Sequence, residues 1–174
     1  MTMGKISKVL YGQQRDNTEW ETDKEFFKLL NERFNFTLDC CATSRNRKCK
    51  KYYSKLVNAL TKKWIGRVFM NPPYGKNINL WIKKAYLEVK KGNADIVVCL
   101  IPVRTDSQWF CKYSRFAQIV FLAGRLKFGM SGVFSGTGPF GSMLLIFRKN
   151  WEGRGTFKNW DWRNKTKGER NGED

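Results

Sequence analysis

The tetrapeptide Asn71-Pro-Pro-Tyr74 has the residue types and spacing best suited to chemistry in this chain. Its two prolines fix φ and remove two backbone donors, so the turn after the apolar run 67–70 cannot continue as a helix. The Asn71 side-chain oxygen and the Pro72 carbonyl can then point two acceptors at one place, where the two hydrogens of an NH₂ group would fit. Tyr74 offers a flat ring on which a planar amide or a base can stack.

A second interpretation of this tetrapeptide is a proline turn that ends a strand and does nothing else. Asn-Pro is a common turn opening, and Pro-Pro alone is weak evidence. The complete motif is far more specific, because it follows an apolar run and has Gly75 directly behind it. We therefore predict that Asn71, Pro72, Pro73 and Tyr74 form a catalytic site that holds an amino group.

Histidine is absent from all 174 residues. Its absence excludes Ser-His and Cys-His nucleophilic triads, a histidine general base and histidine-ligated metals. The five cysteines include the adjacent pair Cys40-Cys41 and form no C-x-x-C motif. This usage favours reduced thiols in a cytoplasm over disulfides or a zinc site. We therefore expect a site that holds no metal and needs no histidine base.

The charge of the chain predicts a polyanionic partner. Lys and Arg number 33 against 15 Asp and Glu, a net charge of +18. Residues 40–87 contain twelve Lys or Arg and no acid, so the excess lies on the body of the domain and not in a tail. Such a basic domain is typical of nucleic-acid binding. A basic membrane-surface protein is the lesser alternative, because no expected helix has Lys or Arg opposite a wide apolar face.

The pattern of apolar residues predicts alternating helices and strands. A capping box at Thr22-Asp-Lys-Glu25 should open the first helix, with Thr22 as its N-cap, and a second capping box should open a short helix at Thr105. The expected helices cover 22–34, 78–89 and 105–113, and the expected strands cover 36–41, 67–71, 95–101, 118–123 and 142–147.

This order of elements is typical of an α/β domain with a mainly parallel sheet. The last two strands have no helix between them, so they should pair antiparallel at one edge. In such sheets ligands bind at the carboxyl ends of the strands, where the Asn71 turn must fall.

The chain is expected to contain one domain, at residues 20–150. Residues 1–19 should be a polar arm, and residues 151–174 a polar and flexible tail in which Trp151, Trp160 and Trp162 could dock the first part. The first residues lack the apolar region of a signal peptide, and no apolar run approaches transmembrane length, so we expect no membrane contact.

Further motifs make the chain resemble a known family. The chain is similar to the S-adenosylmethionine-dependent amino-methyltransferases and, more narrowly, to the phage and prophage DNA adenine-N6 methyltransferases (Dam type). The shared motifs appear in the family's order between about residues 18 and 149: Trp20-Glu-Thr22, Phe36-Thr-Leu-Asp39, Lys48-Cys-Lys-Lys-Tyr52, Asn71-Pro-Pro-Tyr74, Leu100-Ile-Pro102 and Gly124-Arg-Leu-Lys-Phe128.

The resemblance implies a Rossmann-like methyltransferase fold, with S-adenosylmethionine as the cofactor and double-stranded DNA as the partner. It also implies action in the cytoplasm of a bacterial host, with no obligate protein partner. Asn71 and Pro72 should hold the amine of a flipped-out adenine, Tyr74 should stack on the base, and Asp39 should meet the amino group of the cofactor. The full set of implied cofactor contacts is Trp20, Thr22, Asp39, Cys40, Cys41, Ala42, Asn58 and Asn71.

Three departures from the family pattern keep other functions open. The glycine-rich loop of many methyltransferases reads Asp39-Cys-Cys-Ala-Thr43 here, the acid that contacts the cofactor ribose has no counterpart before Glu88, and Asp-Gly-Leu reads Asn58-Ala-Leu60. One alternative is an amino-methyltransferase that acts on RNA or on a protein glutamine. The other is a non-catalytic nucleic-acid-binding protein, in which local N–H groups would satisfy Asp39.

Seven basic side chains are candidates for contacts with DNA phosphates. A solvated surface is the alternative for each of them. They are Lys48, Lys50, Lys51, Lys62, Lys63, Arg125 and Lys127.

Overall fold

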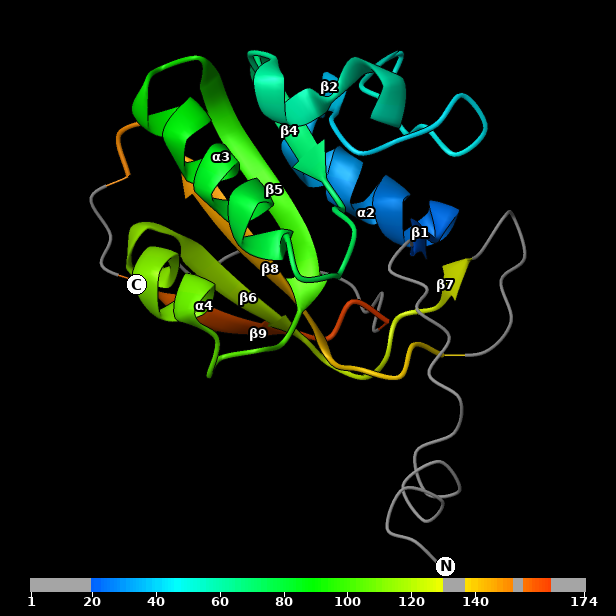
Figure 1. Cartoon of the computed structure of the whole chain (residues 1–174). Helices are drawn as coiled ribbons and strands as arrows, with labels where there is room; N and C mark the ends of the chain where they lie inside the picture. Colours follow the sequence, from blue (N-terminus) through cyan, green and yellow to red (C-terminus); the bar gives the residue numbers. More distant parts are fainter. Residues whose placement is uncertain (1–19, 130–136, 152–154, 164–174) are drawn as a thin grey trace, which may run out of the picture.

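The computed structural model describes residues 20–129, 137–151 and 155–163. A seven-stranded sheet forms its centre, in the order β3-β2-β4-β5-β8-β6-β9 (Figure 1). The strands are β2 (Leu38–Asp39), β3 (Lys51–Tyr52), β4 (Gly66–Met70), β5 (Ala94–Pro102), β6 (Gln118–Leu122), β8 (Ser142–Arg148) and β9 (Phe157–Trp160). A separate antiparallel pair consists of β1 (Glu21–Thr22) and β7 (Phe128–Gly129).

The sheet is mainly parallel, as the sequence predicts. Strands β3, β2, β4 and β5 pair parallel to one another. Strand β8 runs antiparallel to both β5 and β6, which confirms the expected antiparallel pairing of the last two predicted strands. The carboxyl ends of β2, β4 and β5 therefore meet at one edge, and β6 ends at that edge as well.

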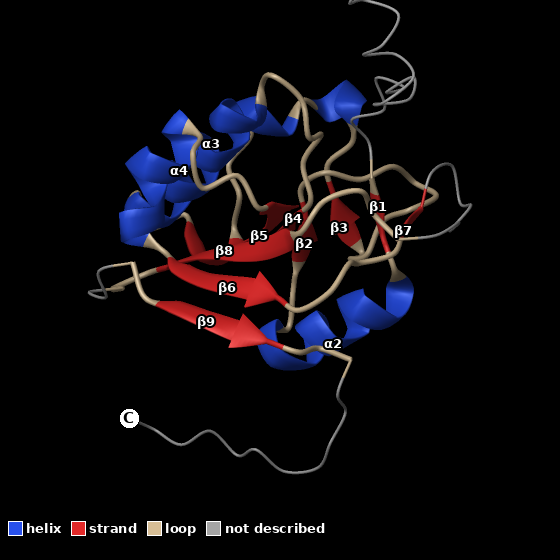
Figure 2. Cartoon of the chain, turned by 90° about the horizontal axis from the view of Figure 1, so that it is seen from below, coloured by secondary structure: helices blue, strands red, loops and turns tan. Residues whose placement is uncertain are grey.

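Helices cover both faces of the sheet (Figure 2). Helices α3 (Ile78–Lys90) and α4 (Gln108–Tyr113) lie on one face, and α2 (Lys24–Phe34) lies on the other. Each face has its own apolar core, one built around Trp64 and Ile82 and the other around Phe26 and Leu30. This layering agrees with the predicted Rossmann-like α/β class.

The N-cap of the first helix lies one residue later than predicted. Asp23 is its N-cap, and the Asp23 carboxylate accepts hydrogen bonds from the backbone N–H groups of Glu25 (3.0 Å) and Phe26 (3.1 Å). The hydroxyl of Thr22 is not available as a cap, because it accepts from the side chain of Asn71. The prediction of Thr22 as the N-cap is therefore wrong, whereas the prediction of a helix here is confirmed.

The capping box predicted at Thr105 is wrong. Helix α4 begins at Gln108, and its N-cap Ser107 makes no side-chain capping bond. The Ser107 hydroxyl instead donates to the carbonyl of Arg104 (2.7 Å), which closes a turn over residues 104–107. That turn takes up the residues that the prediction gave to the start of the helix.

Part of the predicted tail belongs to the sheet. Residues 157–160 form β9, which pairs parallel to β6 and is the outermost strand on that side of the sheet. Trp160 and Trp162 lie against Phe26 of α2, with ring centroids 6.0 and 5.2 Å apart. This aromatic contact accounts for the docking of a polar segment. The predicted arm and the end of the tail lie outside the described residues.

No helix in the described part of the chain is both long enough and apolar enough to cross a membrane.

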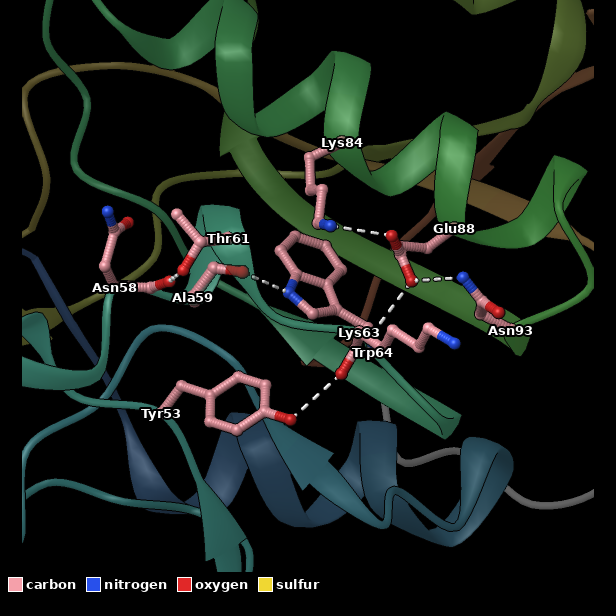
Figure 3. A network of polar contacts seen from close by, with 9 residues as sticks. All are labelled: Tyr53, Asn58, Ala59, Thr61, Lys63, Trp64, Lys84, Glu88 and Asn93. Atoms are coloured by element: carbon pink, nitrogen blue, oxygen red, sulfur yellow. Dashed lines mark hydrogen bonds and ion pairs between the residues drawn. The ribbon is translucent and has the colours of Figure 1, made fainter.

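A buried carboxylate fixes the loop that connects β3 to β4 (Figure 3). Glu88 of α3 is 3 % exposed and forms an ion pair with Lys84 (2.7 Å). Its second oxygen accepts from the Trp64 backbone N–H (3.0 Å) and from the Asn93 amide (2.9 Å). The Trp64 indole in turn donates to the Ala59 carbonyl (2.9 Å), so α3 and the loop are held together through one side chain.

We predict that Glu88→Gln lowers the free energy of unfolding by about 1–3 kcal/mol at neutral pH, because it removes a charged acceptor from this network. Burial alone would raise the pKa of Glu88, but the hydrogen bonds from Lys84, Trp64 and Asn93 outweigh it, and the pKa lies below its ordinary value. The stabilisation is therefore present above the unfolded-state pKa and is lost as the pH falls through the folded-state pKa.

Urea unfolding of both proteins at a series of pH values checks this prediction, and the two curves should converge in acid. The matched control is Glu32→Gln on the exposed face of α2, which should change stability little. An equal loss in both variants would mean that the network contributes nothing specific.

Candidate active site

The Asn71 turn lies where parallel strands β2, β4 and β5 end. Asn71 directly follows β4, and Asp39 ends β2 at a position paired with Phe69 of β4. Adjacent strands are separated by about 4.8 Å, so Asp39 and the turn are neighbours. The fold thus confirms the expected position of the motif at the carboxyl edge.

The amide of Asn71 is held in one orientation. Its Nδ2 donates to the Trp20 carbonyl and to the Thr22 hydroxyl, the latter at 3.0 Å. Its Oδ1 is buried and has no hydrogen-bond partner among the described residues. A buried acceptor without a partner costs free energy, so the site presents one oxygen that is ready for an N–H donor. The role of this oxygen as the acceptor for a target amine stays a prediction.

Tyr74 forms one wall of an aromatic cluster. Its hydroxyl donates to the Leu100 carbonyl at the end of β5 (3.1 Å), which fixes the ring. The ring centroid of Phe140 lies 5.4 Å away and that of Phe128 6.2 Å away. Trp20 contacts both phenylalanines, at 5.4 and 5.8 Å. Four aromatic rings therefore gather beside the Asn71 amide.

Burial raises the pKa of Tyr74 well above its ordinary value, with a smaller effect from nearby Cys41. The phenol therefore remains a protonated donor to the Leu100 carbonyl at all physiological pH values. Tyr74 is thus suited to hold a flat surface in place, and not to take up a proton.

Phe140 contacts Tyr74, but the motifs do not identify it as a candidate site residue. It lies in a glycine-rich segment that the sequence predicts only as a loop or hairpin, and Phe128 could be either a core or a site residue. The pairing of β1 with β7 brings Phe128 opposite Thr22, and Phe140 packs on Phe128 at 5.6 Å. The one available signal is a single aromatic residue among glycines at 136–141.

Asp39 is satisfied in part by its own neighbourhood. The side chain is 2 % exposed, and its oxygens accept from the backbone N–H groups of Cys41 (3.2 Å) and Lys48 (3.0 Å). Burial raises the pKa of Asp39, although these two hydrogen bonds and the charge of Lys48 act in the opposite direction. A carboxylate has about four acceptor positions, and two of them are used by these backbone N–H groups.

The residues after Asp39 lie at the carboxyl end of β2. Cys40 and Ala42 are buried, and Cys41 is half-buried. The Ala42 N–H donates to the Tyr53 carbonyl (3.0 Å), and the Tyr53 N–H donates to the Asp39 carbonyl (2.9 Å). Burial raises the pKa of both thiols, Cys40 and Cys41, which favours their protonated form. Their small side chains keep this segment compact without glycines.

Asn58 lies apart from these residues, in the loop between the 3₁₀ helices Lys55–Val57 and Ala59–Thr61. Its backbone is left-handed, with φ of 49°, and its carbonyl accepts from Thr61 (Figure 3). The residue is exposed. The turn alone explains an asparagine here, and its contact with a cofactor stays a prediction.

The basic candidates divide between the two ends of the sheet. Arg125 and Lys127 are exposed and follow β6 at the active-site edge, whereas Lys62 and Lys63 precede β4 at its other end. Lys50 and Lys51 are exposed at β3. Lys48 is half-buried beside Asp39, and burial lowers its pKa.

No group of three or more Cys, Asp or Glu side chains in the described ranges is arranged to hold a metal ion.

Comparison with known proteins agrees with this geometry. The family model described as "DNA N-6-adenine-methyltransferase (Dam)" matches residues 10–174. The chain belongs to this family. Of the similar curated proteins, the DNA N-6-adenine-methyltransferase of Escherichia phage T1 is 29 % identical over 156 residues, which cover 77 % of this chain and 64 % of the relative. That of Haemophilus phage HP1 is 32 % identical over 101 residues, 56 % of this chain and 57 % of the relative.

This Dam-family chain thus spans less than two thirds of the length of either relative. Among solved structures, a protein from Pyrococcus horikoshii described as an RNA methyltransferase matches 74 % of this chain and 60 % of its own length, with 14 % identity and a TM-score of 0.35.

The orientation of the Asn71 amide generates a prediction. Thr22→Val removes one of its two acceptors while keeping the side-chain volume, so the amide should lose its fixed orientation. Under the function proposed below, the rate of methyl transfer should fall about 10- to 100-fold, which corresponds to about 1.4–2.8 kcal/mol. Thr22→Ser restores the hydroxyl and should restore most of the rate. A Thr22→Val protein as active as the unaltered chain would show that the Thr22 hydroxyl does not position Asn71.

Proposed function

We propose that this chain transfers a methyl group from S-adenosylmethionine to the exocyclic amine of adenine in double-stranded DNA. The observation that carries the proposal is the buried Oδ1 of Asn71, which lacks a partner among the described residues and lies beside four aromatic rings. Membership of the Dam family and the net charge of +18 support adenine in DNA as the target.

The residues present fit the cofactor. Asp39 retains acceptor positions for the ammonium group of the methionine part, and a cation beside this carboxylate would lower its raised pKa. The small side chains of Cys40, Cys41 and Ala42 allow a ligand to approach the backbone closely. S-adenosylmethionine supplies an electrophilic methyl group on a sulfonium centre.

The chain's own residues would activate the amine by alignment. The lone pair of an adenine amine is delocalised into the ring, so the amine is a poor nucleophile. Acceptors at Asn71 Oδ1 and the Pro72 carbonyl, in a turn fixed by Pro73, would bind its two hydrogens and favour the pyramidal form. Each hydrogen bond contributes about 1 kcal/mol, or more if it forms only in the transition state, and in-line positioning contributes most of the rest.

The proposed reaction requires no strong base, because the product ammonium is acidic and loses its proton readily. This agrees with a sequence without histidine. The target base would have to leave the duplex, at a cost of a few kcal/mol. Stacking of the base on Tyr74 and contacts of basic residues with phosphates would offset that cost.

The relatives are phage proteins, and we infer that the chain acts in the cytoplasm of a bacterial host, without an obligate protein partner. The charge disfavours a protein glutamine as the target, and RNA is the nearer alternative substrate. The two backbone N–H groups that bind Asp39 favour one further candidate, a non-catalytic nucleic-acid-binding protein.

Incubation with labelled cofactor and duplex DNA, followed by digestion to nucleosides, tests the proposal. We expect labelled N6-methyladenine from the unaltered chain and none above background from Asn71→Ala. The matched control is Asn77→Ala, an exposed asparagine at the start of α3 whose side chain makes no capping bond, and it should keep full activity. Equal labelling by Asn71→Ala and the unaltered chain would overturn the proposal.

Parallel incubations with RNA and with protein decide between the substrates. Calorimetric titration with S-adenosylmethionine decides the last alternative. Absence of heat in the titration, together with retained DNA binding, would favour the non-catalytic nucleic-acid-binding protein.

A further inference from the structure

Three arginines gather at the edge of the sheet opposite the Asn71 turn. Arg67 lies at the start of β4 and Arg148 at the end of β8, and both pair with Ile96 of β5. Side chains of directly paired residues point to the same face, and Ile96 belongs to the core under α2. Arg33 reaches this place from the last turn of α2.

The three guanidinium groups surround Phe34, the last residue of α2. Those of Arg33 and Arg148 each lie 5.7 Å from the centroid of the Phe34 ring. The Nε of Arg67 donates to the Phe34 carbonyl. The cluster formed by Arg33, Arg67 and Arg148 is called the arginine cluster below.

The fold accounts for only part of the arginine cluster. The carboxyl end of a helix attracts cations, which explains the bond of Arg67 to the Phe34 carbonyl. An aromatic face also attracts cations, which explains the position of Arg33 over the Phe34 ring. However, no carboxylate in the described part of the chain forms an ion pair with any of the three.

The Nε of Arg148 is buried and lacks a hydrogen-bond acceptor within the described ranges. Burial lowers the pKa of Arg148, and the charges of Arg33 and Arg67 lower it further. A buried donor without an acceptor and three repelling cations are both costly, and one anion would compensate both.

We propose that Arg33, Arg67 and Arg148 form a phosphate-binding site that is separate from the Asn71 site. Guanidinium groups donate pairs of parallel hydrogen bonds that match phosphate oxygens. The phosphate of a DNA backbone is the favoured source, and this part of the inference rests on the proposed function.

Helix α2 extends from the Asn71 site to the arginine cluster. Thr22, which precedes the helix, contacts Asn71, and Phe34 ends the helix at the arginine cluster. Eleven residues at about 1.5 Å each span about 16 Å. This equals about five base pairs of duplex at about 3.4 Å per step. A duplex with its target base at Asn71 could therefore bring a flanking phosphate to the arginine cluster.

The test uses the full chain with Arg33→Gln and Arg148→Gln combined, and it leaves Arg67 in place because Arg67 caps α2. The matched control is Lys83→Gln with Lys90→Gln, which removes two charges from the exposed surface of α3. DNA affinity is measured over a series of salt concentrations with two duplexes. One extends about 15 base pairs on each side of the target adenine, and the other extends only about three.

On the long duplex, we expect the plot of log affinity against log salt to lose about one unit of slope in the arginine variant, since one lost phosphate contact removes about 0.9. On the short duplex the arginine variant should match the unaltered chain. Equal losses in the lysine control would mean general electrostatics, and would overturn a DNA phosphate at this site.

A second measurement does not depend on DNA. Inorganic phosphate should raise the unfolding temperature of the unaltered chain relative to chloride at equal ionic strength, and should raise it less in the arginine variant. Phosphate stabilisation that depends on the arginines, combined with unchanged DNA slopes, would assign the site to a free phosphate-bearing molecule. No dependence on the arginines in either measurement would overturn the site. Neither readout requires methyl transfer, so failure of the proposed enzymatic function would be seen separately.

Discussion

The two hydrogen bonds donated by the Asn71 amide connect parts of the chain that would otherwise have no reason to meet. One end of each bond lies in the turn after β4, and the other lies at Trp20 and Thr22, about 50 residues earlier. Through β1 and β7 the same contact brings in Phe128, and through Phe128 it brings in Phe140. The aromatic cluster, the start of α2 and the Asn71 turn are therefore connected through one small amide.

Two buried carboxylates hold loops of the domain in place. The buried carboxylates Asp39 and Glu88 each bind backbone N–H groups of a loop, at Cys41 and Lys48 in one case and at Trp64 in the other. Both loops leave the same half of the sheet and carry many of the basic residues. Asp39, directly before the strongly basic segment 40–87, and Glu88, directly after it, thus hold the loops of this segment in place.

Much of this arrangement could be predicted from the sequence, because the strongest signals were local. The apolar runs predicted β4, β5, β6 and β8, and the proline turn predicted the acceptor at Asn71. The errors came from competition between local patterns and distant partners. Thr22 matched a capping box, but Asn71 uses its hydroxyl. Strand β9 was missed because its residues are mostly exposed and only its pairing with β6 and the packing of Trp160 on Phe26 make it a strand. The only local signal for Phe140 is that it is a single aromatic residue among glycines, and no local pattern indicates the arginine cluster, since the neighbours of these residues come from distant parts of the chain.

The position of β8 between β5 and β6 has a consequence for synthesis on the ribosome. Strand β8 (Ser142–Arg148) pairs with both neighbours, so β5 and β6 cannot reach their final spacing until it has been translated. Phe140, which completes the aromatic cluster beside Tyr74, emerges just before it. The strands that carry Asp39 and Asn71 can pair earlier, but a nascent chain lacks the closed aromatic site. The aromatic cluster and the connection of β5 to β6 through β8 are therefore completed together, when a long-range pairing replaces a temporarily open sheet edge.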